Sequence, residues 1–121
     1  MARILIVDDE APILRLLTRI LTREGFTIRT AADGAEAVTM CSSEAFDLVL
    51  SDVVMPGMDG HQLAQWVAGR YPWTQTALMT GFDTACQGCA YSPRCHILAK
   101  PFIARDVLAF VRGALTSARP S

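Results

Sequence analysis

The sequence predicts one doubly wound α/β domain with a parallel sheet, on three observations. The chain has 121 residues, which is a usual length for a single compact domain. Short aliphatic runs such as Ile4-Leu5-Ile6-Val7 are typical of strands that are buried on both faces of a parallel sheet. These runs alternate with segments whose apolar residues recur at helical spacing, which is the pattern of helices packed on both sides of such a sheet.

The expected elements follow one another without a repeat or a linker. Strands are expected at 3–7, 26–30, 46–50, 76–79 and 96–99, and helices at 12–24, 34–42, 61–69 and 103–115. Pro12 suits the first turn of the first helix and Gly25 suits its C-terminal cap. Asp33 is expected to cap the second helix. We expect one domain over residues 1–118 and a short tail at 119–121.

The connection between the fourth and fifth strands breaks the alternation. A right-handed crossover between parallel strands normally carries a helix. Residues 81–95 contain Gly88, Pro93 and three cysteines, which leave room for little more than about one or two helical turns. We therefore expect the fourth helix to be shortened or replaced by a cysteine-rich loop.

Composition and charge exclude several functional classes. The net charge is −1 and the basic residues are scattered, so no electrostatic footprint for nucleic acid is expected. No apolar run approaches the ~20 residues that span a bilayer. The opening apolar run is too short for a signal peptide and is followed by acids. We expect a cytoplasmic protein that binds neither nucleic acid nor membrane.

Polar residues follow the ends of the predicted strands: Asp8 and Asp9 after the first, Asp52 after the third, Thr80 after the fourth and Lys100 after the fifth. Ligands of open α/β sheets bind beyond the carboxyl ends of the strands. Neighbouring strands would therefore bring three carboxylates, a hydroxyl and an ammonium together. Three close carboxylates favour a hard divalent cation such as Mg²⁺. A carboxylate beside Mg²⁺ and an ammonium is set up to attack phosphorus and to form an aspartyl phosphate.

Other chemistries of doubly wound domains lack their motifs here. The turn after the first strand has neither Gly-x-Gly-x-x-Gly nor a Walker A sequence, so a nucleotide would lack its backbone cradle. A flavodoxin-like phosphate site is disfavoured by the acids at that turn, and a thioredoxin-like site by the late position of Cys-x-x-Cys. A phosphatase that uses an acid after the first strand is a further alternative, but such enzymes usually show Asp-x-Asp.

Four motifs in register resemble those of response-regulator receiver domains. They are Ile4-Leu5-Ile6-Val7-Asp8-Asp9-Glu10, Asp52 with the turn Met55-Pro56-Gly57-Met58-Asp59-Gly60, Thr80, and Lys100-Pro101-Phe102. The resemblance covers essentially the whole chain. It implies a CheY-like, flavodoxin-like sheet of five strands in the order 2-1-3-4-5. It also implies a phosphoacceptor of a two-component phosphorelay, which is no enzyme beyond its own phosphoryl transfer and dephosphorylation.

The resemblance also implies a role for each residue of the site. Asp52 would accept the phosphoryl group and contribute to the metal site. Asp9 would bind Mg²⁺ directly, Asp8 would bind it largely through water, and the backbone carbonyl of Val54 would be a further ligand.

Thr80 and Lys100 would hold the phosphoryl group. The donor would be a phosphohistidine on a sensor histidine kinase or a histidine phosphotransfer protein, and the output would pass to a downstream protein partner. Ile97 departs from the pattern, because receiver domains usually carry an aromatic residue three positions before the lysine. The usual swing of that ring, coupled to the threonine hydroxyl, cannot operate here unchanged.

The same residues also have purely structural interpretations. Asp9 or Glu10 could serve only to cap the following helix. Asp52 could be a turn residue. Thr80 could be an ordinary strand-end hydroxyl, and Lys100 a solvated surface group.

The cysteines support a second hypothesis of a different class. Cys86, Cys89 and Cys95 are clustered just before His96, and Cys-x-x-Cys is the spacing of a zinc or iron–sulfur ligand pair. A metal site, a redox-active or disulfide pair and plain reduced thiols all stay open. Under this alternative the protein is a redox- or metal-responsive interaction module. Cys41 is expected to be a small buried hydrophobe on the second helix.

Overall fold

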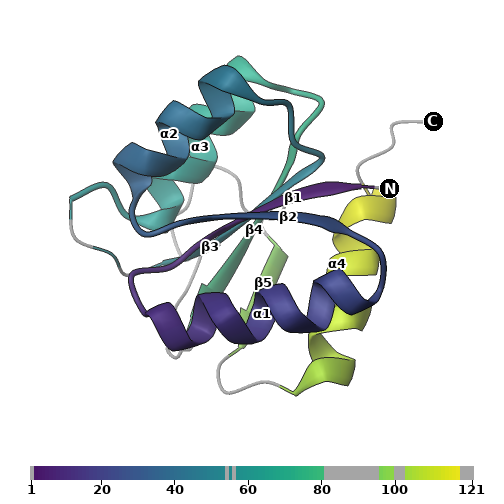
Figure 1. The fold of residues 1–121 in the computed structure, drawn as a ribbon. Coiled ribbons are helices and arrows are strands. Elements are labelled where there is room, and N and C mark those ends of the chain that lie inside the picture. Colours follow the sequence, from purple (N-terminus) through teal and green to yellow (C-terminus); the bar gives the residue numbers. More distant parts are fainter. Residues whose placement is uncertain (1, 54, 56, 81–95, 100–102, 118–121) are drawn as a thin grey trace.

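The parallel α/β arrangement is confirmed in a computed structural model, which describes residues 2–53, 55, 57–80, 96–99 and 103–117 (Figure 1). The strands are β1 (Arg3–Val7), β2 (Thr27–Ala31), β3 (Leu48–Asp52), β4 (Gln75–Thr80) and β5 (His96–Ala99). The helices are α1 (Ala11–Arg23), α2 (Gly34–Ser43), α3 (Gly60–Arg70) and α4 (Ala104–Ser117). Each predicted element lies within a few residues of an observed one. The prediction for residues 81–95 falls outside the described residues.

The five strands form one parallel sheet in the order β2-β1-β3-β4-β5. The register brings the strand ends to one edge, because Val7 of β1 pairs with Ser51 of β3, and Asp52 pairs with Met79 of β4. At the outer pair, Thr80 of β4 is opposite Ala99 of β5. Residues that follow these strands therefore start from a common edge, as the sequence predicts.

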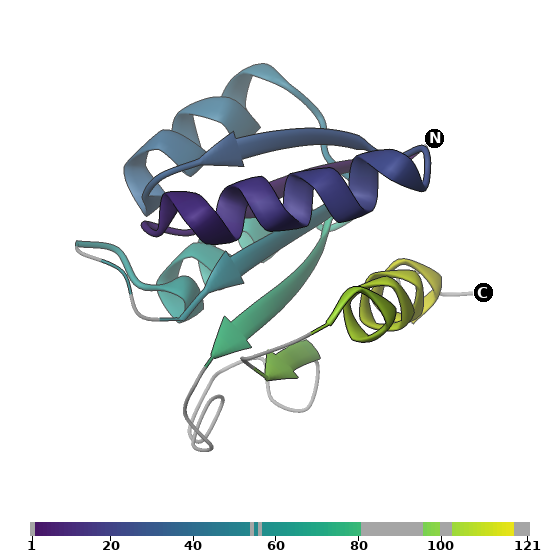
Figure 2. The same cartoon turned by 60° about the horizontal axis from the view of Figure 1, so that its bottom comes forward.

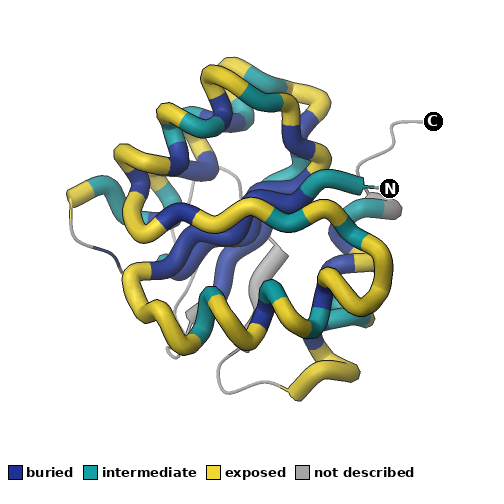
Figure 3. The backbone as a smooth tube through the Cα atoms, in the orientation of Figure 1, coloured by how far each residue is buried: buried dark blue, intermediate teal, exposed yellow. Residues whose placement is uncertain are grey.

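The helices cover both faces of the sheet. Figures 1 and 2 show α1 and α4 on one face and α2 and α3 on the other. The side chains of β1 alternate between the two layers: Ile4 and Ile6 belong to the core under α1 and α4, and Leu5 and Val7 to the core under α2 and α3. All four are fully buried, which explains the continuous aliphatic run. Figure 3 shows the buried strands between helices whose outer faces are exposed.

The ends of the helices follow the local chemistry of the sequence. The Asp33 carboxylate accepts a hydrogen bond from the Glu36 N–H at 2.8 Å, so the predicted cap of α2 is confirmed. Helix α3 begins with a capping box, in which Asp59 accepts from the Gln62 N–H and the Gln62 side chain accepts from the Asp59 N–H, each at 2.9 Å. At the end of α1, Gly25 has a φ of 95°, a left-handed conformation that favours glycine.

Candidate functional site

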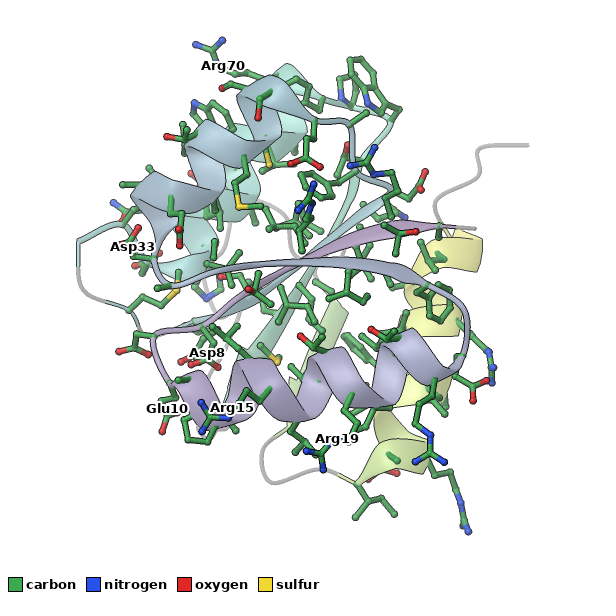
Figure 4. The ribbon with its side chains drawn as sticks, viewed as in Figure 1. Asp8, Glu10, Arg15, Arg19, Asp33 and Arg70 are labelled. Atoms are coloured by element: carbon green, nitrogen blue, oxygen red, sulfur yellow. The ribbon has the colours of Figure 1, made fainter. Side chains whose placement is uncertain are left out.

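Three carboxylates come together at the carboxyl edge of the sheet. Asp8 follows β1, Glu10 precedes α1 and Asp52 ends β3, and one carboxylate oxygen of each lies within 4.8 Å of the other two. Asp8 is fully buried and Asp52 is 7% exposed, whereas Glu10 is exposed. Figure 4 shows Asp8 and Glu10 next to each other at the start of α1, with Asp33 at the start of α2 on the same side of the molecule.

Backbone hydrogen bonds hold the segment that carries Asp8 and Glu10. The Asp8 N–H donates to the Ala31 carbonyl at 3.1 Å, which continues the pairing of β1 with β2 by one residue. The Glu10 N–H donates to Asp8 Oδ1 at 2.8 Å. Glu10 is the N-cap residue of α1 in extended conformation, but its side chain forms no capping hydrogen bond. Helix capping therefore does not explain the position of the Glu10 carboxylate.

The position of Asp52 depends on the close approach of α3. The Val53 N–H donates to the Met79 carbonyl at 3.0 Å, and the Gly60 N–H donates to the Val53 carbonyl at 2.8 Å. A Cβ atom on Gly60 would lie 2.3 Å from the Asp52 carbonyl oxygen and 2.9 Å from the Val53 Cα atom. Only glycine lets α3 begin against the strand end that carries Asp52.

The structure brings together two of the predicted metal ligands, Asp8 and Asp52. Asp9 is exposed and is not a member of the carboxylate group among the described residues. Thr80 is the last residue of β4, directly after Met79, the partner of Asp52 in the register. Its side chain lies outside the described part of the structure, as do Val54 and Lys100. The roles of Asp9, Val54, Thr80 and Lys100 stay predictions.

Glu10 is the member of the group for which the sequence predicts no metal role. The signal that could have found it is its spacing from Asp8. Side chains two positions apart in an extended backbone lie on the same side, and the residue between them lies on the other. Asp8 and Glu10 fit this alternation, and the exposed Asp9 lies between them.

The donor set of this group fits a hard divalent cation. Carboxylate oxygens are the ligands that Mg²⁺ prefers, and Mg²⁺ commonly binds through one or two carboxylates while it keeps several waters. Three like charges with oxygen atoms within 4.8 Å of one another also repel. A bound cation would offset that repulsion.

Of the four cysteines, Cys41 is the one that the structure describes. Cys41 is buried, as predicted, and it forms no disulfide. Burial raises the pKa of its thiol to about 11. Cys86, Cys89, Cys95 and the side chain of His96 lie outside the described residues, so a zinc or iron–sulfur site there has no support from the structure.

Among the helices that the structure describes, none is long and apolar enough to cross a bilayer.

Curated relatives of this chain are bacterial response regulators. FleR of Pseudomonas aeruginosa is 40% identical over 114 residues, which cover 91% of this chain and 24% of FleR. CpdR of Brucella abortus, a response regulator receiver protein, is 33% identical over 120 residues, which cover 98% of this chain and 100% of CpdR. The match with the transcriptional regulatory protein TcrA of Mycobacterium tuberculosis spans 31% of that protein. The chain thus spans a third or less of FleR and TcrA.

Solved structures of response regulators have the same fold as this chain. A CheY-like receiver domain protein from Methanospirillum hungatei superposes with a TM-score of 0.88 at 28% identity, over 98% of this chain and 96% of that one. TrrA from Thermotoga maritima, solved in complex with Mg²⁺-BeF, superposes with a TM-score of 0.85 at 31% identity, over 94% of this chain and 99% of that one.

A sequence profile described as "Response regulator receiver domain" matches residues 4–112. This range includes all three carboxylates of the site and the whole sheet except Arg3, the first residue of β1. The chain therefore belongs to the response regulator receiver domain family of two-component systems.

Proposed function

We propose that this domain is a phosphoacceptor and that Asp52 accepts the phosphoryl group. The observation that carries the proposal is the meeting of Asp8, Glu10 and Asp52 at the carboxyl edge of the sheet, with oxygen atoms within 4.8 Å. A nucleophilic carboxylate at the end of a central strand, beside further carboxylates that can hold a cation, is the arrangement that aspartyl phosphorylation needs.

The residues around Asp52 fit Mg²⁺, which would be held by the carboxylates of Asp8 and Asp52. The family resemblance adds Asp9 and the Val54 carbonyl to this set. When bound, Mg²⁺ supplies positive charge to the oxygens of the phosphoryl group. The complex of TrrA with Mg²⁺-BeF supports this assignment for a receiver of the same fold.

The transfer step itself is a displacement at phosphorus. A carboxylate oxygen of Asp52 forms a bond to the phosphorus atom, and the bond between phosphorus and the imidazole nitrogen of the donor breaks, with its electron pair going to the nitrogen. Thr80 and Lys100 would then hold the phosphoryl oxygens, as the resemblance implies. The domain catalyses only this transfer and the later hydrolysis, so we do not class it as an enzyme.

The donor in this proposal is a phosphohistidine on a sensor histidine kinase or a histidine phosphotransfer protein. The output passes to a downstream protein by protein–protein interaction. Both assignments rest on membership of the receiver family, whose relatives FleR and TcrA are regulatory proteins.

The proposal is tested with acetyl phosphate, a small-molecule donor that needs no partner protein. The protein is incubated with acetyl phosphate and Mg²⁺, and its intact mass is measured. We expect one added phosphoryl group on the wild type, none on Asp52→Asn, and an unchanged gain on Asp106→Asn, which removes an exposed carboxylate from α4. A wild type that gains no mass, or an Asp52→Asn variant that gains as much, contradicts the proposal.

A further inference from the structure

We propose that the amino-edge pocket, a cavity where the strands of the sheet begin, binds a guanidinium group such as that of an arginine side chain. The pocket is bounded by residues 41–46, at the end of α2 and before β3, and by Tyr71, Trp73 and Thr74, which precede β4. The proposed phosphoacceptor lies at the opposite edge of the sheet, so the two proposals are independent.

The place and the size of the pocket follow from two neighbouring helices. Helices α2 and α3 lie side by side on one face of the sheet (Figure 1), and the segments that follow them meet at the amino edge. The volume of the pocket is about 250 Å³. Drug-sized ligands fill cavities of roughly 300–1,000 Å³, so this pocket suits a smaller group, of the size of one side chain.

Aromatic rings form one wall of the pocket. The rings of Tyr71 and Trp73 meet edge to face with their centroids 5.6 Å apart. Trp73 is 64% exposed, whereas Phe46 is buried. The face of an aromatic ring carries partial negative charge and attracts a cation within about 6 Å of its centroid. The chain itself already makes such a contact here, because the guanidinium carbon of Arg3 lies 5.7 Å from the Phe46 centroid.

The hydroxyl groups of the pocket are acceptors toward a ligand. Ser42 and Ser43 donate their hydroxyl hydrogens to carbonyls about one turn back in α2, at 2.9 and 3.2 Å. Thr74 donates its hydroxyl hydrogen to the Phe46 carbonyl at 2.7 Å. Each of these oxygens keeps a lone pair that can accept a further hydrogen bond. A group that enters the pocket must therefore donate hydrogen bonds to them.

The end of α2 and the carboxylate of Glu44 add further acceptors. Helix α2 ends at Ser43 with no basic residue in its last turn, so no cation of this helix offsets the negative end of its dipole. Arg3 and Arg29 both bind Oε1 of Glu44, with Arg29 at 3.2 Å. Within the described part of the chain Oε2 has no hydrogen bond, so it remains an acceptor for a ligand.

The charges beside the pocket favour guanidinium over other groups. The positive charges of Arg3 and Arg29 balance the negative charges of Glu44 and Asp47. An anion would face acceptor oxygens, and an ammonium group is strongly hydrated and gains little where the local charges cancel. A guanidinium group has five N–H donors and no acceptor, is weakly hydrated and stacks on aromatic rings. It matches both the aromatic wall and the acceptors.

The test is a titration of the ¹⁵N-labelled full chain with methylguanidinium chloride, followed by two-dimensional ¹H–¹⁵N NMR. We expect saturable shifts of the Trp73 indole N–H and of the backbone N–H groups of Ser42 and Thr74, with a Kd in the millimolar range. Urea has the planar shape without the charge, and methylammonium has the charge without the plane, so both are expected to bind more weakly. Shifts that do not saturate, or equal binding of urea or methylammonium, overturn the proposal.

Trp73→Leu removes one ring of the wall. We expect it to raise the Kd for methylguanidinium by about two- to fivefold, the effect of one exposed cation–π contact, as measured on the backbone signals of Ser42 and Thr74. Trp66→Leu is the matched control, because Trp66 lies on α3 outside the pocket, and it is expected to bind as the wild type does. Thermal unfolding checks that both variants are folded. A folded Trp73→Leu variant with the Kd of the wild type overturns the proposal.

Arginine itself and a capped peptide with one arginine distinguish two sources of the guanidinium group. A lower Kd for the peptide assigns the pocket to an arginine of a partner protein. A lower Kd for the amino acid assigns it to a small molecule. Binding of neither overturns the proposal and leaves the phosphoacceptor proposal intact.

Discussion

The carboxylates of Asp8 and Asp52 are almost completely buried, and the exposed carboxylate of Glu10 adds a third negative charge beside them. Three carboxylates this close repel one another. That mutual repulsion costs the folded state free energy when no divalent cation is bound. Function and stability conflict at these residues, and that conflict can be measured.

We expect Asp52→Asn to be more stable than the wild type in EDTA by at least about 1 kcal/mol, because two unit charges within 4.8 Å of each other repel by about that amount in water and by more when they are buried. We also expect saturating Mg²⁺ to stabilise the wild type more than the variant. Urea unfolding in EDTA and in Mg²⁺ measures both differences. A variant that is destabilised in EDTA would show that the carboxylate of Asp52 is a net stabilising group.

Cys41 makes stability depend on pH. Burial raises the pKa of its thiol from the ordinary value of 9.0 to about 11. The thiol ionises at lower pH in the unfolded chain, so its contribution to stability is complete below pH 9 and is lost as the pH rises toward 11. We expect the stability difference between the wild type and Cys41→Ala to shrink over that range in urea titrations. A difference that does not change with pH would show that the thiol ionises equally in both states.

At this scale the sequence predicted part of the site. Asp8 and Asp52 were predicted to meet because each follows a buried aliphatic strand, and strand ends of a parallel sheet share an edge. For Glu10 the sequence offers only the structural alternative that it or Asp9 caps the following helix. The place of Glu10 in the group depends on the extended backbone between β1 and α1, which the identities of three consecutive acids do not reveal.

At the scale of elements, the site depends on where β3 ends and α3 begins. The sequence predicts an aliphatic strand over 46–50 that ends at Ser51 and Asp52. The structure confirms this end, because Ser51 and Asp52 pair with Leu78 and Met79 of β4. The strand begins at Leu48, where its pairing with β1 and β4 begins, and not at Phe46. Pairing with neighbouring strands decides where a strand begins, and that information is tertiary.

We expect Gly60→Ala to destabilise the fold and to slow phosphorylation by acetyl phosphate, because the new Cβ atom would lie 2.3 Å from the Asp52 carbonyl oxygen. The backbone of either α3 or Asp52 must shift. Overpacking of this kind typically costs about 1–3 kcal/mol. Urea unfolding and the rate of mass gain measure the two effects.

Gly69→Ala is the matched control in the same helix. A Cβ atom on Gly69 has no neighbour within 4 Å, and alanine is the better helix former by about 1 kcal/mol. We expect this variant to be as stable as the wild type or more so, with an unchanged rate of phosphorylation. Equal behaviour of Gly60→Ala and Gly69→Ala would contradict the close approach of α3 to Asp52.

At the scale of the whole molecule, two apolar layers fix the sheet that aligns the strand ends. The doubly wound class was predictable because strand and helix periodicities alternate along the chain. The order β2-β1-β3-β4-β5 was not, since periodicity says nothing about which strands are neighbours. That order came from the family resemblance, and it is what places Asp8 and Asp52 on adjacent strands.

We expect Leu50→Ala to cost about 2–5 kcal/mol, because Leu50 of β3 is fully buried in the layer under α1 and α4. Leu16→Ala removes the same atoms from the surface of α1, where Leu16 is 39% exposed, and is expected to cost much less. Urea unfolding compares the two. Similar costs would contradict the packing of this layer.

The central claim is that a carboxylate of Asp52 becomes an acyl phosphate, and borohydride trapping tests it most directly. Borohydride reduces an aspartyl phosphate to homoserine, which tandem mass spectrometry locates in the sequence. After incubation with acetyl phosphate and Mg²⁺, we predict homoserine at position 52. Homoserine at another aspartate, or none at all, would contradict the account.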